Sequence, residues 1–71
     1  MFGLTAAHRE LPLGSLVKIT NLTNQRSVVV RINDRGPWIP HRIIDLSYAA
    51  SKALGLVRPG IARVRLDRLS R

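Results

Sequence analysis

The segment Val28-Val29-Val30-Arg31-Ile32-Asn33-Asp34-Arg35-Gly36-Pro37 carries the clearest structural signal in this chain. Its first half is rich in β-branched residues and predicts a half-buried strand, whereas its second half contains residues that favour turns. Asp34 is therefore expected on the first loop residue after a rigid strand, where a carboxylate is held in place but still meets a ligand. Arg31 and Arg35 place positive charge beside it. These features make Asp34 the first candidate for a catalytic side chain.

The chain has 71 residues and a formal net charge of +8 at pH 7. This length allows one domain, residues 1–71, with a thin hydrophobic core. A positive charge of this size attracts polyanions such as nucleic acid, anionic lipid headgroups or acidic cell-wall polymers. The chain contains one Phe, one Trp and one Tyr. Because so few aromatic residues hardly build a base-stacking platform, no nucleic acid partner is expected.

The composition also bears on metal sites and targeting. The sequence contains no cysteine and two histidines, His8 and His41, which lie far apart in the chain. No recognised spacing of metal ligands is visible, so neither a metal nor another cofactor is expected. No stretch approaches the roughly 18–20 apolar residues of a membrane span, and the first residues lack the pattern of a signal peptide. Any export signal is expected to lie outside this sequence.

Alternating apolar and polar residues predict a hairpin of two strands. The strands are expected over residues 15–20 and 27–32, with a polar turn over residues 21–25. Residues 4–8 are ambiguous between strand and loop. Residues 42–44 read as a short apolar bridge between the proline-containing loop and the segment that follows.

One short helix is predicted over residues 48–54. Ser47 suits its N-cap, and Gly55 supplies a left-handed stop. A turn over residues 57–60 and a final strand over residues 62–67, with one basic face, complete the chain. Short strands with one small helix favour a small β-barrel.

Five segments resemble, in the right order, the signatures of the rare lipoprotein A family of bacterial envelope proteins. They are Thr5-Ala6-Ala7-His8-Arg9, Leu11-Pro12, Val17-Lys18-Ile19-Thr20-Asn21-Leu22, Val30-Arg31-Ile32-Asn33-Asp34-Arg35-Gly36-Pro37 and Arg42-Ile43-Ile44-Asp45-Leu46-Ser47-Tyr48-Ala49-Ala50. The resemblance covers about residues 4–66 and implies a mainly β fold, the six-stranded type of double-psi β-barrel with one short helix. This barrel is similar to the first domain of expansins and to barwin.

Members of this family carry an earlier segment with a glycine-rich first strand and a conserved glutamate. The resemblance therefore implies that the barrel of this chain lacks its N-terminal strand and that its activity is impaired. An edge left unpaired by the missing strand is expected to favour self-association.

The resemblance implies lytic transglycosylase activity on peptidoglycan. Such a lyase cleaves the bond between N-acetylmuramic acid and N-acetylglucosamine without water and leaves a 1,6-anhydro sugar. One carboxylate can serve as both acid and base, so the carboxylate pair of ordinary glycosidases is not required. Glycan strands are the implied partner, and the periplasm or outer membrane is the implied location. Two other classes remain open: a non-catalytic, expansin-like glycan-binding module, and a basic nucleic-acid-binding barrel.

Carried over to this sequence, the family's site falls on His8 and Asp34. Asp45 matches the acid that expansin-like barrels place in the same cleft. The resemblance assigns Asp34 as the acid/base, His8 as its hydrogen-bonding partner or proton relay, and Asp45 as a positioning or electrostatic group. Each residue also has a plainer structural alternative. These are an Asx-turn for Asp34, a histidine bonded to a backbone carbonyl for His8, and a helix-start acid for Asp45.

Four further side chains are candidates for substrate contact: Arg31, Asn33, Arg35 and Trp38. Trp38 is expected to be exposed in the loop after Asp34 and to stack on a sugar ring, whereas Tyr48 at a helix position is expected to pack there. The arginines suit the lactyl carboxylates of muramic acid, with solvated surface charge as the alternative. Asn33 equally suits the turn.

Overall fold

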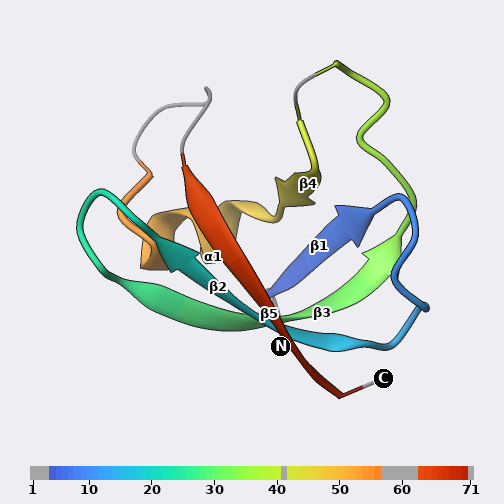
Figure 1. The fold of residues 1–71 in the computed structure, drawn as a ribbon, viewed down its shortest axis with the longest axis horizontal. Helices are drawn as coiled ribbons and strands as arrows, with labels where there is room; N and C mark the ends of the chain where they lie inside the picture. Colours follow the sequence, from blue (N-terminus) through green and yellow to red (C-terminus); the bar gives the residue numbers. More distant parts are fainter. Residues whose placement is uncertain (1–3, 41, 57–62, 71) are drawn as a thin grey trace.

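The computed structural model describes residues 4–40, 42–56 and 63–70. In chain order its elements are β1 (Thr5–His8), β2 (Leu16–Asn21), β3 (Ser27–Asp34), β4 (Ile44–Leu46), α1 (Tyr48–Ala53) and β5 (Val64–Ser70). The strands form one sheet in the order β4-β1-β3-β2-β5, which curls into a half-barrel (Figure 1). This mainly β fold with one short helix confirms the predicted class. His41, the predicted turn over residues 57–60 and the predicted start of the last strand lie outside the described residues.

The predicted hairpin is confirmed as the antiparallel pair β2 and β3. Val17 and Val30 are directly paired and completely buried. The strand β2 runs on to Asn21, which the sequence places in the turn. This side chain is only 3% exposed, and its Nδ2 donates to the carbonyl oxygen of Leu54 at 3.0 Å. A buried amide requires such a partner, so Asn21 ties the hairpin to the end of α1.

Two strands are clearer in the structure than in the sequence. The ambiguous residues 4–8 contain β1, which pairs parallel with β3 and antiparallel with β4. The predicted bridge over residues 42–44 gives way to β4, a strand of three residues. Such short segments carry little periodicity, and their partners are distant in the chain. Their strand character therefore depends on pairing that no local pattern reveals.

The helix α1 begins where the sequence predicts and ends at Ala53, one residue before the predicted end. The side chain of Ser47 caps its start by accepting a hydrogen bond from the backbone N–H of Ala50 at 3.2 Å. Gly55 follows the C-cap residue with a φ of +79°, a left-handed conformation that glycine adopts at little cost. Ala50 and Leu54 lie one turn apart and are buried against the sheet.

The core is thin, as expected for this length. Its buried hydrophobic side chains are Ala6, Val17, Ile19, Val30, Ile32, Ala50 and Leu54. Val64 and Leu66 of β5 pack against this core, whereas Arg65 and Arg63, which comes just before the strand, are exposed. The predicted basic face of the last strand is thereby confirmed.

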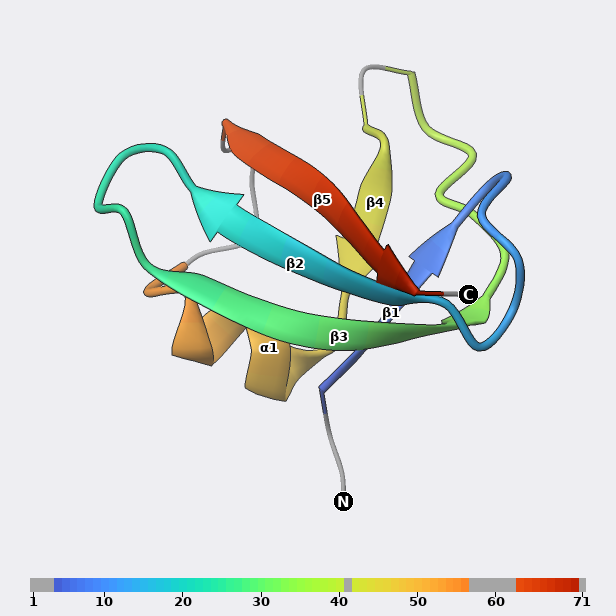
Figure 2. The same ribbon diagram turned by 60° about the horizontal axis from the view of Figure 1, so that its bottom comes forward.

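The strands β4 and β5 are the two edges of the sheet, and both lie above β3 in the view of Figure 2. Self-association through an edge stays a prediction. No helix among the described residues is long and apolar enough to cross a membrane.

Candidate functional site

The C-terminal ends of β1 and β3 lie side by side because these neighbouring strands run parallel (Figure 1). Their register pairs Ala6 with Ile32 and then Ala7 with Asp34, so it passes over Asn33. Such an irregularity re-aims the side chains that follow it, and here it gives Asp34 the position beside Ala7. The strand β3 includes Asn33 and Asp34, so the prediction that these residues form a loop is wrong. Parallel pairing with β1 extends the strand through them.

Asp45 lies on the other side of Ala7. The antiparallel register of β1 and β4 pairs Ala7 with Asp45, so Asp34, Ala7 and Asp45 form one row across three strands. Residues opposite each other in register project to the same face, and their neighbours along the strand project to the other. Because Ala6 is buried in the core, this row belongs to the outer face. Two strand spacings separate the Cα atoms of the two acids by roughly 10 Å.

The electrostatic surroundings of the two acids differ. Oδ1 of Asp34 accepts a hydrogen bond from the backbone N–H of Arg35 at 2.8 Å. This bond goes to the next residue, whereas an Asx-turn bonds two residues on. Within the described part of the chain, no ion pair involves Asp34, but Nη2 of Arg42 lies 3.7 Å from Oδ1 of Asp45. Asp45 lies in β4, and the first turn of α1 contains no acidic residue. The helix-start interpretation places Asp45 two residues before the N-cap Ser47, as the structure does, so it stays an alternative.

His8 is the last residue of β1 and thus lies at the same end of the sheet as Asp34. Its Nδ1 accepts hydrogen bonds from the backbone N–H groups of Glu10 at 3.0 Å and Leu11 at 3.1 Å. We therefore assign the hydrogen of the neutral ring to Nε2. Among the described residues, no hydrogen bond joins the imidazole of His8 to Asp34 or to a backbone carbonyl. Its Nε2–H group can instead donate to a ligand.

Two arginines fasten turns beside this row. Nη1 of Arg35 donates to the carbonyl oxygens of His8 at 3.1 Å and Leu11 at 2.6 Å, which holds the turn that follows β1. Nη1 of Arg31 donates to the carbonyl oxygen of Gly14 at 3.0 Å. Both guanidinium groups therefore have backbone partners. The alternative, in which each arginine is only a solvated surface charge, does not describe them. Their remaining N–H groups can still meet an anion.

Arg9 holds the loop that carries Trp38. Its Nε donates to the carbonyl oxygen of Pro37 at 2.8 Å, and its Nη2 donates to that of Arg42 at 2.6 Å. One guanidinium thus joins both ends of the loop to the end of β1. Trp38 is 72% exposed, which confirms the exposure expected of a sugar-stacking residue. Arg9 is not a candidate from the sequence, because two long-range bonds to backbone atoms leave no local pattern.

Arg9→Ala is expected to loosen this loop and to lower the free energy of unfolding by about 1–2 kcal/mol, because two hydrogen bonds to a charged donor are lost. Trp38 is the only tryptophan in the chain, so its fluorescence anisotropy reports on the loop directly and should fall. Arg68→Ala removes an exposed arginine from β5 and should leave the anisotropy unchanged. Wild-type anisotropy in Arg9→Ala would show that the loop is held in another way.

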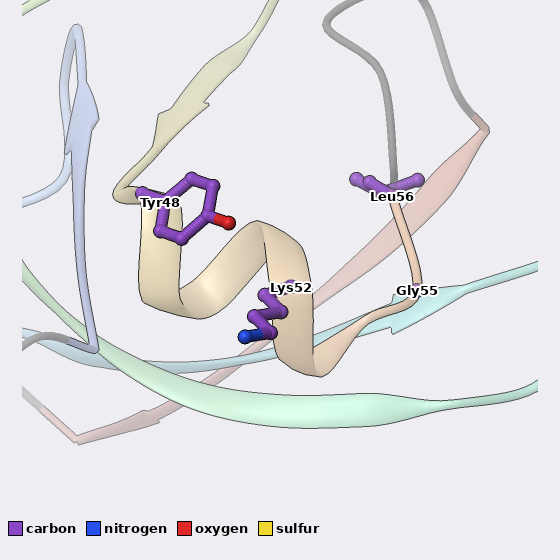
Figure 3. Close-up of a pocket in the computed structure, with 4 residues that line it drawn as sticks. All are labelled: Tyr48, Lys52, Gly55 and Leu56. Carbon is purple, nitrogen blue, oxygen red and sulfur yellow. The ribbon is translucent and has the colours of Figure 1, made fainter.

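A separate hollow lies on the exposed side of α1. Tyr48, Lys52, Gly55 and Leu56 line a cavity of about 200 Å³ (Figure 3). Tyr48 is 80% exposed, so the prediction that it packs against the fold is wrong. The signal was present in the sequence, because residues 48 and 52 lie two positions away from the apolar residues 50 and 54 and thus face away from the core. The described residues contain no cluster of metal-ligating side chains.

Comparison with known proteins places the chain in a family. The family model described as "Lytic transglycolase" matches residues 1–66. The chain belongs to this lytic transglycolase family. The resemblance to rare lipoprotein A proteins and the double-psi β-barrel fold that it implies are thereby confirmed.

Several curated relatives share this domain. The chain is 55% identical over 67 residues, or 94% of its length, to the endolytic peptidoglycan transglycosylase RlpA of Pseudomonas aeruginosa. It is 59% identical over 63 residues (89% of the chain) to RlpA of Pasteurella multocida. It is 56% identical over 68 residues (96% of the chain) to a probable RlpA of Nostoc. It covers 20%, 21% and 18% of these relatives, about a fifth of their length.

Proposed function

We propose that this domain is a lytic transglycosylase that cleaves the glycan strands of peptidoglycan in the bacterial cell envelope. Membership of the family and the printed names of the RlpA relatives support this activity. The observation that carries it is the row of Asp34, Ala7 and Asp45 on one outer face, with His8 at the same end of β1. Such a row offers two carboxylates to one extended ligand. The imidazole of His8 is not part of the row, because His8 follows Ala7 along β1, but it lies at the edge where β1 ends.

In this proposal Asp34 acts first as acid and then as base. Its carboxylic acid protonates the glycosidic oxygen as the bond from C1 of the muramyl sugar to that oxygen breaks. The 6-hydroxyl oxygen of the same sugar then bonds to C1, and its proton passes to the Asp34 carboxylate. The proton that Asp34 donated is thus replaced, a 1,6-anhydro ring is formed, and no water is consumed.

Asp45 and His8 have supporting roles in the proposed reaction. The negative charge of Asp45, on the same face, stabilises the positive charge that develops at C1. The Nε2–H of His8 donates to the sugar near the cleaved bond. Trp38 stacks on a neighbouring ring, and Asn33 and the free N–H groups of Arg31 and Arg35 contact the strand. Nucleic acid is not a partner in this proposal.

Incubation with purified, peptide-free glycan strands tests the proposal. Mass spectrometry should detect new 1,6-anhydromuramyl ends that increase with time and with protein concentration. Retention on intact glycan without new ends would support the expansin-like binding module instead. If the domain ignored glycan but bound duplex DNA at physiological salt, the proposed function would be wrong.

A further inference from the structure

The hollow on α1 is lined by an aromatic and a basic side chain that follow Asp45 in the sequence. Tyr48 and Lys52 lie one helical turn apart, on the side of α1 away from the buried Ala50 and Leu54. In Figure 3 both side chains lie along α1, and Leu56 lies beyond the C-terminal end of the helix. None of the residues that line this hollow belongs to the row of acids.

Backbone hydrogen bonds at the C-terminal end of α1 fix the position of Gly55 and Leu56, two of the residues that line the hollow. The backbone N–H of Gly55 donates to the carbonyl oxygen of Lys52 at 3.0 Å, and that of Leu56 donates to the carbonyl oxygen of Ser51 at 2.9 Å. These two bonds form a Schellman motif, which turns the chain back beside the helix. Gly55 has a φ of +79°, a conformation that favours glycine, and a Cβ atom there would also displace the side-chain Nδ2 of Asn24, which would lie 2.8 Å away. The wall formed by Leu56 is therefore preformed and not created by a ligand.

The lining residues suit a ring that carries a negative charge. Tyr48 offers an aromatic face with 80% of its surface exposed, and the half-buried Leu56 adds an apolar wall. No carboxylate pairs with Lys52 among the described residues, so its ammonium is available to an anion. A cavity of about 200 Å³ is smaller than the roughly 300–1,000 Å³ of sites for drug-sized ligands. It therefore has room for one ring and not for a longer piece of strand.

We propose that this hollow is a second glycan subsite, which binds a muramic acid residue away from the cleaved bond. Tyr48 stacks on the apolar face of the pyranose ring, and Lys52 pairs with the lactyl carboxylate. Tyr48 follows Asp45 by three residues, which span at most about 11 Å of chain. Because β4 is an edge of the sheet, a strand seated on the acids passes round this edge to reach the hollow. This inference rests on the proposed function and names the charged group that the domain recognises.

Calorimetric titration with two probes tests the subsite. The first probe is peptide-free glycan strands with free lactyl carboxylates, and the second is the same strands with these carboxylates reduced to alcohols. Lys52→Gln should weaken binding of the first probe about 2–5-fold and leave binding of the second unchanged. Tyr48→Ala should weaken binding of both probes about 2–10-fold. Both side chains are exposed, so the fold should persist, and circular dichroism checks this.

The chain supplies a matched control, because its other lysine, Lys18, is exposed on β2. Lys18→Gln should bind both probes as the wild type does. If Lys52→Gln and Tyr48→Ala also bound both probes with wild-type affinity, the proposed subsite would be wrong. That conclusion would hold even if the wild-type protein produced anhydro ends. The titrations are made in the Asp34→Asn background, in which the probe strands stay intact. A wild-type protein that does not cleave would therefore refute the activity and leave the subsite test intact.

Discussion

Asp34→Asn is expected to lower the rate of glycan cleavage by about 10²–10⁴-fold, the usual contribution of a general acid or base. An asparagine has nearly the same size, and its side-chain oxygen can still accept the hydrogen bond that Arg35 N–H donates to Oδ1 at 2.8 Å. It cannot, however, donate the proton that the leaving oxygen requires. The rate at which 1,6-anhydromuramyl ends appear measures the loss, and binding of the glycan should change far less.

Two companion variants make this result interpretable. Asp67→Asn is the control, because Asp67 lies in β5 and outside the row of Asp34 and Asp45. This variant should cleave at the wild-type rate. Asp45→Asn should cleave more slowly than wild type but faster than Asp34→Asn, since Asp45 transfers no proton in the proposed reaction. If Asp45→Asn abolished cleavage while Asp34→Asn retained it, the proposed roles of the two acids would be reversed.

Ile32→Ala is expected to lower the free energy of unfolding by about 2–5 kcal/mol, the cost of emptying a well-packed aliphatic site. Ile32 is 0% exposed and pairs with Ala6 across β3 and β1. A domain of this size is stabilised by only about 4–10 kcal/mol in total, so the variant should be partly unfolded at moderate temperature. Urea denaturation followed by circular dichroism measures the change, with the slope checked against wild type.

Neighbouring substitutions separate the effect of the cavity from the effect of the strand. Ile32→Val removes one methylene group and should cost about 0.5–1.5 kcal/mol. Val29→Ala changes an exposed residue of the same strand and should stay within about 0.5 kcal/mol of wild type. A loss below about 0.5 kcal/mol in Ile32→Ala, at an unchanged slope, would contradict the central position of this side chain. Because Ile32 precedes Asp34 by two residues, Ile32→Ala should also cleave glycan more slowly.

Local patterns are sufficient for the hairpin and the helix. Alternation of apolar residues predicts the buried faces of β2 and β3, and Ser47 and Gly55 mark the two ends of α1 where the structure has them. These features depend on interactions between residues close together in the chain, or on the period of side chains along one strand. The family resemblance likewise follows from short motifs, and the match to residues 1–66 confirms it.

The arrangement of the candidate site depends on contacts between distant parts of the chain. The register that passes over Asn33 gives Asp34 the place beside Ala7, and β4 brings Asp45 to the other side of the same residue. Arg9 reaches the Trp38 loop across 28 residues of sequence. No local pattern encodes such contacts, because each one forms only when separate segments pack and their backbone groups find partners. The sequence therefore identifies the two acids as candidates, whereas only strand pairing brings Asp34 and Asp45 to the same face of the sheet.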